Sequence, residues 1–190
     1  MKLVVGLGNP DREYRDTYHN IGFNATDILA ARLNAPDFAF DKKSNAELAD
    51  MSAFGGDRLI LCKPRTYMNL SGDAVAYLAR YYKIDPTDIL VMYDDIDIAK
   101  GVVRARLNGS AGTHNGMRDI VAKLGSTDFA RVRIGTGFKP NYMTLADYVL
   151  SHFPSGERDL LKAACEAASG FAEKWIRGEY WQDLTVTVAR

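Results

Sequence analysis

The stretch that decides the fold is residues 2–10, which read KLVVGLGNP. Lys2–Leu7 is a short apolar run with two adjacent valines, a composition typical of a buried strand. Gly8-Asn9-Pro10 ends this run, because glycine and proline favour a sharp loop. The sequence therefore predicts a buried strand with a polar loop at its carboxyl end.

Further strands and helices alternate along the rest of the chain. Apolar or alternating runs predict strands over 58–62, 89–93, 102–107 and 131–135. Apolar residues at helical spacing predict helices over about 21–33, from a Ser71 cap to Tyr82, over 117–124 before Gly125, and from a Ser155 cap to about Gly178. This alternation predicts an α/β layer structure with a largely parallel or mixed sheet. Since 47% of the 190 residues are apolar, we expect residues 1–190 to form a single domain.

The charge and cysteine content narrows the class of protein. Basic and acidic residues number 24 each, so any nucleic-acid binding must rest on a local basic patch. Cys62 and Cys165 lack metal-ligand spacing and are too few for a disulfide framework, so we expect buried thiols in a reducing cytosol. The amino-terminal residues carry no cleavage-site pattern and no apolar run near the ~20 residues of a membrane helix. We expect a soluble cytoplasmic protein with no membrane contact.

Polar side chains collect where the predicted strands end. These are Asn9, Asn69, Asp94 and Asn115, and His19 lies in the first of the loops. Ligands of open α/β sheets bind beyond the carboxyl ends of the strands, so these positions could converge on one pocket. A histidine with an aspartate, and no nucleophile motif, suggests that His19 activates water while the aspartate fixes its tautomer. Singly, each of these residues also fits an ordinary surface or turn position.

Competing motifs are weaker. Gly6-Leu7-Gly8 begins like a dinucleotide-binding fingerprint, but Asp11 stands where its third glycine belongs. The chain has neither a GxSxG elbow nor a GxxxxGK[ST] loop. Asp94, Asp95 and Asp97 could hold a cation such as Mg²⁺, although an acidic cluster at the end of a strand is more often a capped, solvated turn.

Two predicted strands carry alternating arginines. Arg104 and Arg106 should share one face, with Val103, Ala105 and Leu107 on the other. Arg131 and Arg133 repeat the pattern, and flanking residues that could widen the patch are Lys100, Arg118, Lys123 and Lys139. Ordinary solvated charge accounts equally well for any one of them.

Five ordered motifs resemble those of bacterial peptidyl-tRNA hydrolase. They are residues 6–22 (GLGNP, Tyr14 and TYHNIG), 63–72 (KPRTYMNLSG), 94–97 (DDID), 113–116 (THNG) and 133–137 (RIGTG). They span nearly the whole chain. The resemblance implies a monomeric α/β protein with a twisted mixed sheet flanked by helices. It also implies hydrolysis of the ester between a peptide and the 3′ end of tRNA, without a cofactor or metal.

The resemblance also implies a role for each matching residue. His19 would be the general base that deprotonates water, and Asp94 would orient His19. Asn9 would help to hold the ester end of the substrate. The residues expected to line the peptide cleft or bind the peptide backbone are Tyr14, Met68, Asn69 and Asn115. The residues expected to hold the phosphates of the acceptor stem are Arg104, Arg106, Arg131, Arg133 and Lys139.

The chain departs from the commoner family pattern at three places. Tyr18 stands where many members carry arginine, Thr113 replaces a usual loop glycine, and Phe138-Lys139 replaces a pair such as Arg-Pro. Threonine resists backbone conformations that glycine allows, so Thr113 could stiffen or reshape the rim of the cleft. Two rival functions remain: an RNA-binding module of the same fold without hydrolysis, and a metal-dependent phosphohydrolase that uses the acidic cluster.

Overall fold

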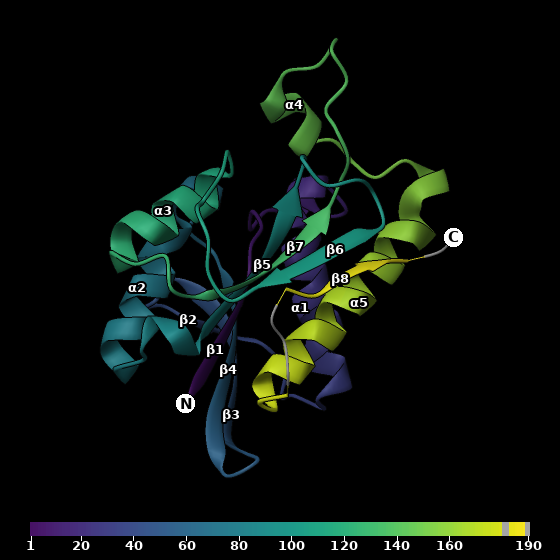
Figure 1. The fold of residues 1–190 in the computed structure, drawn as a ribbon. Helices are drawn as coiled ribbons and strands as arrows, with labels where there is room; N and C mark the ends of the chain where they lie inside the picture. The colour runs from purple at the N-terminus through teal and green to yellow at the C-terminus, as the bar shows by residue number, and fades with distance from the viewer. Residues whose placement is uncertain (180–182, 189–190) are drawn as a thin grey trace.

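The structure is a computed structural model that describes residues 1–179 and 183–188. Its described residues contain one mixed sheet of eight strands, drawn in Figure 1. The strands lie in the order β2 (Ala39–Asp41), β3 (Ala46–Phe54), β4 (Asp57–Pro64), β1 (Lys2–Gly6), β5 (Ile89–Asp95), β7 (Ala130–Gly135), β6 (Val102–Arg106) and β8 (Thr185–Thr187). The central strands β4, β1, β5 and β7 are parallel to one another, whereas β2, β3, β6 and β8 pair antiparallel with their neighbours.

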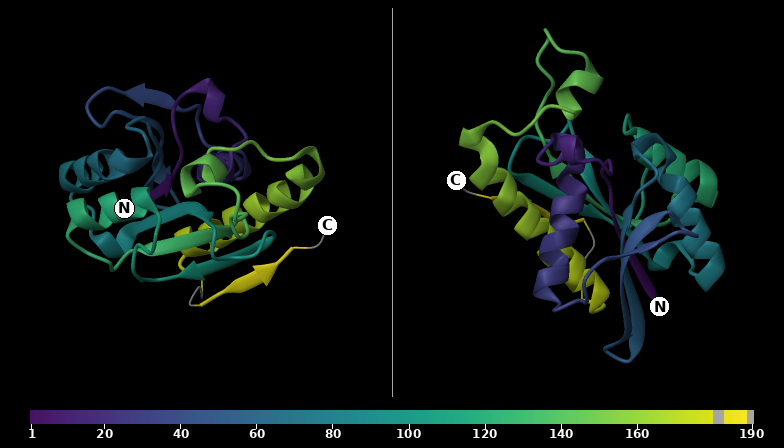
Figure 2. Two further views of the ribbon diagram at one scale, coloured as in Figure 1. Left: turned by 90° about the horizontal axis from the view of Figure 1, so that it is seen from above. Right: turned by 180° about the vertical axis from the view of Figure 1, so that it is seen from behind.

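Helices cover both faces of the sheet. They are α1 (Ile21–Arg32), α2 (Ser71–Tyr82), α3 (Asn115–Leu124), the short α4 (Leu145–Val149) and α5 (Arg158–Ile176). One core cluster joins α1 and α5 to the sheet, and a second joins α2 and α3 to its other face. The right view in Figure 2 shows these two helix layers on opposite sides of the strands. Because α1 and α2 leave the central strands on opposite faces, a crevice forms at the carboxyl ends of those strands.

The α/β fold and its mixed sheet were predicted correctly, and so were the five strands that the sequence pattern indicated. The β2–β3 hairpin, α4 and β8 were not predicted. No helix in the described part of the chain has the length and apolarity needed to cross a membrane.

Two predicted helix caps are wrong. Ser71 is the first residue of α2 rather than its cap, and its hydroxyl donates to the Met68 carbonyl at 2.8 Å. The first turn of α2 is instead capped from α3, since the Asp119 carboxylate accepts the Gly72 N–H at 2.7 Å. Ser155 begins a short 3-10 turn, Ser155–Glu157, and α5 begins three residues later without a side-chain cap. Gly125 does end α3 in the left-handed conformation, as predicted.

The start of α1 is pressed directly onto the sheet. A Cβ atom on Gly22 would lie 2.4 Å from the Met92 carbonyl oxygen and 2.6 Å from the backbone of Leu7. A Cβ on Gly6 would lie 2.0 Å from the Thr26 hydroxyl and 2.4 Å from the Gly22 carbonyl oxygen. These glycines therefore allow the backbone contact that brings the amino end of α1 to the ends of β1 and β5.

This contact makes Gly22→Ala a strongly destabilising substitution. The added methyl must displace backbone atoms, and forced overpacking of this kind costs ~1–3 kcal/mol or more. Gly170→Ala in α5 is the matched control, because nothing lies within 4 Å of the Cβ it would add. The control should be neutral or stabilising by up to ~1 kcal/mol, since alanine favours a helix more than glycine does. Urea unfolding of both variants measures the difference, and equal stabilities would contradict the proposed contact.

Candidate active site

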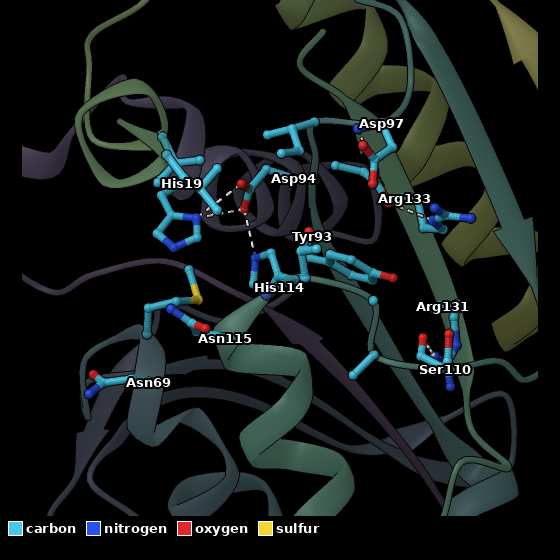
Figure 3. A pocket seen from close by; sticks show the side chains of 18 of the residues that line it. His19, Asn69, Tyr93, Asp94, Asp97, Ser110, His114, Asn115, Arg131 and Arg133 are labelled. Atoms are coloured by element: carbon cyan, nitrogen blue, oxygen red, sulfur yellow. Dashed lines mark hydrogen bonds and ion pairs between the residues drawn. The ribbon is translucent and has the colours of Figure 1, made fainter. Parts of the chain in front are cut away.

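One cavity of about 850 Å³ opens at the carboxyl ends of the central strands. The predicted residues that line it are Asn9, His19, Met68, Asn69, Asp94, Arg106, Asn115, Arg131 and Arg133. Figure 3 shows His19, Asp94, His114 and Asn115 at one end, with Arg131 and Arg133 toward the other. The parallel strands thus bring side chains from distant parts of the sequence to a single site, as the sequence analysis expected.

His19 and Asp94 form a close pair within this cavity. His19 Nδ1 lies 2.9 Å from Asp94 Oδ1 and 3.0 Å from Oδ2. Since an ionised carboxylate only accepts hydrogen bonds, Nδ1 carries the proton and donates it to Asp94. In the neutral ring Nε2 is then the unprotonated nitrogen, and it has no partner among the described residues. In Figure 3 this nitrogen is directed away from Asp94, toward the side where Asn115 lies.

A second imidazole contacts the same carboxylate. His114 Nε2 lies 2.9 Å from Asp94 Oδ1, while His114 Nδ1 accepts the backbone N–H of Met117 at 3.2 Å as the cap of α3. A nitrogen that accepts an N–H cannot also carry a proton, so His114 is the neutral tautomer that donates from Nε2. His114 was quoted in the THNG motif but given no role. Its place directly before a helix start was the available signal, because side chains at that position cap helices.

The pKa values of the pair follow from these contacts. Burial by itself lowers the pKa of His19, but the charge of Asp94 and its hydrogen bond together raise it above the ordinary value. Burial alone would raise the pKa of Asp94, yet the two imidazoles hold it well below its usual value. Asp94 therefore stays ionised, and His19 takes up a proton more readily than a free imidazole does.

The same three side chains raise the question of a metal ion. Among the described residues, His19, Asp94 and His114 are the group of potential ligands that lie within 4.8 Å of one another. A metal on His114 Nε2 would move the ring proton to Nδ1, which already accepts from Met117. Binding would therefore break the cap of α3. In the acidic cluster, Asp95 instead pairs with Arg133 Nε at 2.6 Å and accepts the Asp97 N–H at 2.9 Å, which leaves no converging carboxylate set.

Asn9 is held in one orientation by its neighbours. Its side-chain oxygen accepts the Met68 N–H at 2.8 Å, so its Nδ2 group is left to donate elsewhere. The Asn20 side chain bonds both backbone groups of Asn9, at 2.9 Å each. Asn20 was not predicted as a site residue, although it follows His19 directly. Tyr67, with φ 61° and ψ 159°, takes a backbone conformation that is rare outside glycine and presents the Met68 N–H to Asn9.

Asn69 and Asn115 offer free amides to the cavity. Both side chains are exposed, and neither makes a hydrogen bond within the part of the chain that the structure describes. Asn69 lies in the 3-10 turn Met68–Leu70 before α2, and Asn115 is the first residue of α3. Their helices are joined by the Asp119–Gly72 hydrogen bond, and Lys123 bridges Asp73 and Asp119 at 2.8 and 2.9 Å.

The four arginines of β6 and β7 share a face of the sheet but differ in their partners. Arg104 pairs in register with Arg133, and Arg106 with Arg131, so all four point to one side, as predicted. Leu107 lies beyond the strand and is exposed rather than on the buried face. Arg104 makes no ion pair with a described residue, whereas Arg106 pairs with Asp183 at 3.2 Å.

Arg131 does not fit the expected phosphate surface. It is 2% exposed, and its guanidinium donates to the backbone carbonyls of Ser110, Thr127 and Phe129. A cation whose donors are held in this way anchors the loop over 108–114 to the start of β7. Lys139 likewise folds back, donating to the carbonyls of Pro140 and Met143 at 3.2 and 2.9 Å.

Two further expectations concern the rim. Tyr14 was expected to line the peptide cleft but is not among the residues that line the cavity; it lies half-buried in the turn Arg12–Tyr14. Thr113 was expected to stiffen or reshape the rim of the cleft. The left-handed residues of that loop are Gly109 and Gly112, so threonine fits without a positive φ.

The comparisons with known proteins agree with this geometry. The family model described as peptidyl-tRNA hydrolase matches residues 3–188. A peptidyl-tRNA hydrolase of Lachnoclostridium phytofermentans is 45% identical over 177 residues, covering 93% of this chain and 91% of the relative. One of Chloroflexus aurantiacus is 51% identical over 162 residues, which is 85% of each chain. The crystal structure of peptidyl-tRNA hydrolase from Acinetobacter baumannii superposes with a TM-score of 0.86 at 35% identity, covering 94% of this chain and 89% of that one.

The family match includes the whole candidate site, since the cavity residues from Asn9 to Leu150 fall within residues 3–188. By the family model, the curated relatives and the shared fold, this chain belongs to the peptidyl-tRNA hydrolase family.

Proposed function

We propose that this protein hydrolyses the ester bond between a peptide and the 3′ end of tRNA, with His19 Nε2 as the general base. One observation carries the proposal: Asp94 fixes the proton of His19 on Nδ1 and leaves Nε2 free at the wall of the cavity. A base held in this tautomer can take a proton from water directly. No covalent intermediate on the protein is needed.

The reaction follows from the positions of these groups. His19 Nε2 removes a proton from water as the oxygen attacks the ester carbonyl, and Asp94 stabilises the imidazolium that forms. The tetrahedral intermediate carries a negative oxygen, which a neutral N–H donor can stabilise. When the intermediate collapses, the ribose oxygen leaves and takes up the proton from His19. The products are tRNA with a restored hydroxyl and a peptide carboxylic acid, which releases its proton to solvent and becomes a carboxylate.

The asparagines supply hydrogen bonds without adding charge. Asn9 Nδ2 is the donor that its contact with Met68 leaves available, so we place it at the ester end of the substrate. Asn69 and Asn115 both expose their amides at the cavity, and we assign them to the peptide backbone. Backbone recognition tolerates any peptide sequence, which suits an enzyme whose substrates differ in their side chains.

The tRNA would lie along the arginine face of β6 and β7. Arg104 forms its open part. Arg106 and Arg133 lie beside the cavity, where Arg106 pairs with Asp183 and donates to the Ala105 and Leu184 carbonyls, and Arg133 pairs with Asp95. Arg131 and Lys139 are left out of this surface because their donors are occupied by carbonyl groups. Phosphate contacts of this kind give affinity without reading sequence.

We further propose that residues 1–190 form one catalytic domain that works as a monomer in the cytoplasm without a cofactor. Every group assigned to the reaction comes from a single chain around one sheet. Cys62 and Cys165 are both buried free thiols, which agrees with a reducing compartment.

The general-base proposal predicts that His19→Ala lowers kcat/KM for N-acetylaminoacyl-tRNA by ~10²- to 10⁴-fold. His152→Ala is the matched control, since this exposed histidine lies outside the cavity. His152→Ala should keep the melting temperature of the parent protein, whereas His19→Ala should stay folded but melt at a lower temperature, because it leaves the buried Asp94 with one imidazole donor. Near-normal turnover by His19→Ala would rule out the base.

Running the same assay in a chelator separates the rival mechanisms. Cleavage should persist in the chelator. If the chelator abolished cleavage of a short peptidyl-ester substrate, that loss would favour the metal-dependent rival. Binding of tRNA without any cleavage by the parent protein would favour the rival RNA-binding module.

The Asp94 contact predicts a specific pH dependence. The base works when His19 is neutral, so kcat should fall as pH drops through its pKa, with a midpoint above ~6.5. Asp94→Asn removes the charge that raises this pKa, so the midpoint should move to lower pH while kcat falls. Rate profiles from pH 5 to 8 measure both. An unmoved midpoint would show that the acidic limb reports another group.

The arginine face predicts a change in the salt dependence of tRNA binding. Each lost phosphate contact should reduce the slope of log affinity against log salt by ~0.7–0.9. Arg104→Gln should therefore weaken and flatten the binding of deacylated tRNA. Arg80→Gln, at the far end of α2, is the control with the same loss of charge. If Arg104→Gln slows cleavage of a minimal peptidyl ester equally, the arginine serves the catalytic centre or the fold instead.

A further inference from the structure

A charged cluster lies next to the site and takes no part in the proposed reaction. Lys100 Nζ lies 2.7 Å from both carboxylate oxygens of Glu157 and 2.8 Å from the Tyr18 hydroxyl oxygen. The Tyr18 hydroxyl in turn donates to Glu157 Oε2 at 2.6 Å. Tyr18 is 2% exposed, and burial raises the pKa of its hydroxyl, so it stays a donor. The three residues come from separate segments that the cluster holds together.

One of these segments carries the catalytic turn. Tyr18 and His19 are consecutive residues of the 3-10 turn Tyr18–Asn20. The Tyr18 side chain enters the cluster, whereas His19 lines the cavity. The backbone on the amino side of this turn is also tied down, because Tyr18 N–H donates to the Ser151 carbonyl at 3.2 Å and Phe153 N–H donates to the Asp16 carbonyl at 2.8 Å.

The other side of the cluster contacts α4 and the segment that leads into it. The cavity residues from this part of the chain are Leu145, Ala146, Val149 and Leu150, so α4 forms an apolar wall. The Tyr148 ring lies 4.8 Å from the Tyr18 ring, and the Tyr148 hydroxyl donates to the Thr136 carbonyl at 2.6 Å. The Lys100 stem packs on the left-handed Gly137, where an added Cβ would lie 2.9 Å from Lys100 Cγ. In Figure 1 the segment that carries α4 projects beyond the end of the sheet.

We propose that Tyr18 is a positioning residue that holds α4 at a fixed distance from the His19 turn, so that α4 forms the wall against which the peptide part of the substrate packs. The inference rests on the proposed function, because it takes the cavity to be the peptide site. The Lys100–Glu157 pair is only partly buried, and ion pairs that solvent can screen add little to stability. The value of this cluster is geometric: one hydroxyl contacts both Glu157, which follows α4 in the chain, and Lys100, whose stem packs on Gly137 before α4.

The test is Tyr18→Phe, which keeps the ring contacts with Tyr148 and Phe153 and removes the hydroxyl. KM for a tRNA carrying a peptide of several residues should rise roughly two- to tenfold, the size expected for one lost hydrogen bond. KM for N-acetylglycyl-tRNA should stay within experimental error, because this substrate has little peptide to pack on α4. The kcat of both substrates and the acidic limb of the rate profile should stay unchanged, since the His19–Asp94 contact remains.

Lys100→Met provides a second, independent variant, because it keeps the aliphatic stem on Gly137 and removes the ammonium group. It should raise KM in the same substrate-dependent way, and the double variant should be no worse than the poorer single one, since both act through one unit. Arg32→Gln is the control, because it breaks the Arg32–Glu173 pair between α1 and α5 at 2.9 Å, away from α4.

Three results would overturn the proposal. A lower melting temperature with unchanged KM would make the cluster merely structural. A lower kcat with a shifted acidic limb would mean that Tyr18 acts on His19 rather than on α4. An equal rise of KM for both substrates would remove the contact between α4 and the peptide. If the parent protein cleaves neither substrate, the proposed function fails before this inference is reached.

Discussion

The buried carboxylate of Asp94 is the group on which the arrangement of the site depends. An ionised group inside a protein is costly unless hydrogen bonds replace its water, and Asp94 receives N–H donors from two imidazoles. One imidazole comes from the turn after β1, and the other from the residue that caps α3. The end of β5, the start of α1 and the start of α3 must therefore meet at one point. The close backbone contact at Gly6 and Gly22 makes that meeting sterically possible.

Around this charge the site is built from neutral hydrogen-bonding groups. The Asn20 side chain holds the backbone of Asn9, and the Asn9 side chain accepts the Met68 N–H. The orientation of the Asn9 amide therefore depends on both Asn20 and Met68. Such a connected set keeps its donors aimed without needing further charges. The arginines lie toward the other end of the cavity (Figure 3). In the proposed function, the amides bind the uncharged ester and the arginine face binds the polyanion, although the formal net charge of the molecule is zero.

The sequence predicted what depends on periodicity and missed what depends on tertiary contacts. Runs such as Lys2–Leu7 determine both the strand and its burial, and the rule for parallel strands then places Asp94 and Asn115 at one edge. The β3 strand was missed because its residues, AELADMSAF, mix small, charged and apolar side chains without a strong pattern. Ser71 was a plausible cap by type, but Asp119 from another helix supplies that bond. Alternation correctly put Arg131 on the arginine face, yet it could not indicate that a loop covers this residue.

The burial of Arg131 has a consequence for the thermodynamics of substrate binding. The loop over 108–114 contains Gly109 and Gly112, and glycines give an unfolded chain more conformational freedom than other residues do. By holding the Ser110 carbonyl against the start of β7, the guanidinium removes that freedom during folding rather than during binding. In the proposed function, a peptide bound beside Asn115 would meet a loop that this contact already holds, so its affinity would not be reduced by the entropy of ordering that loop. A glycine-containing part of the cavity wall is in this way preorganised by a cation that is itself buried.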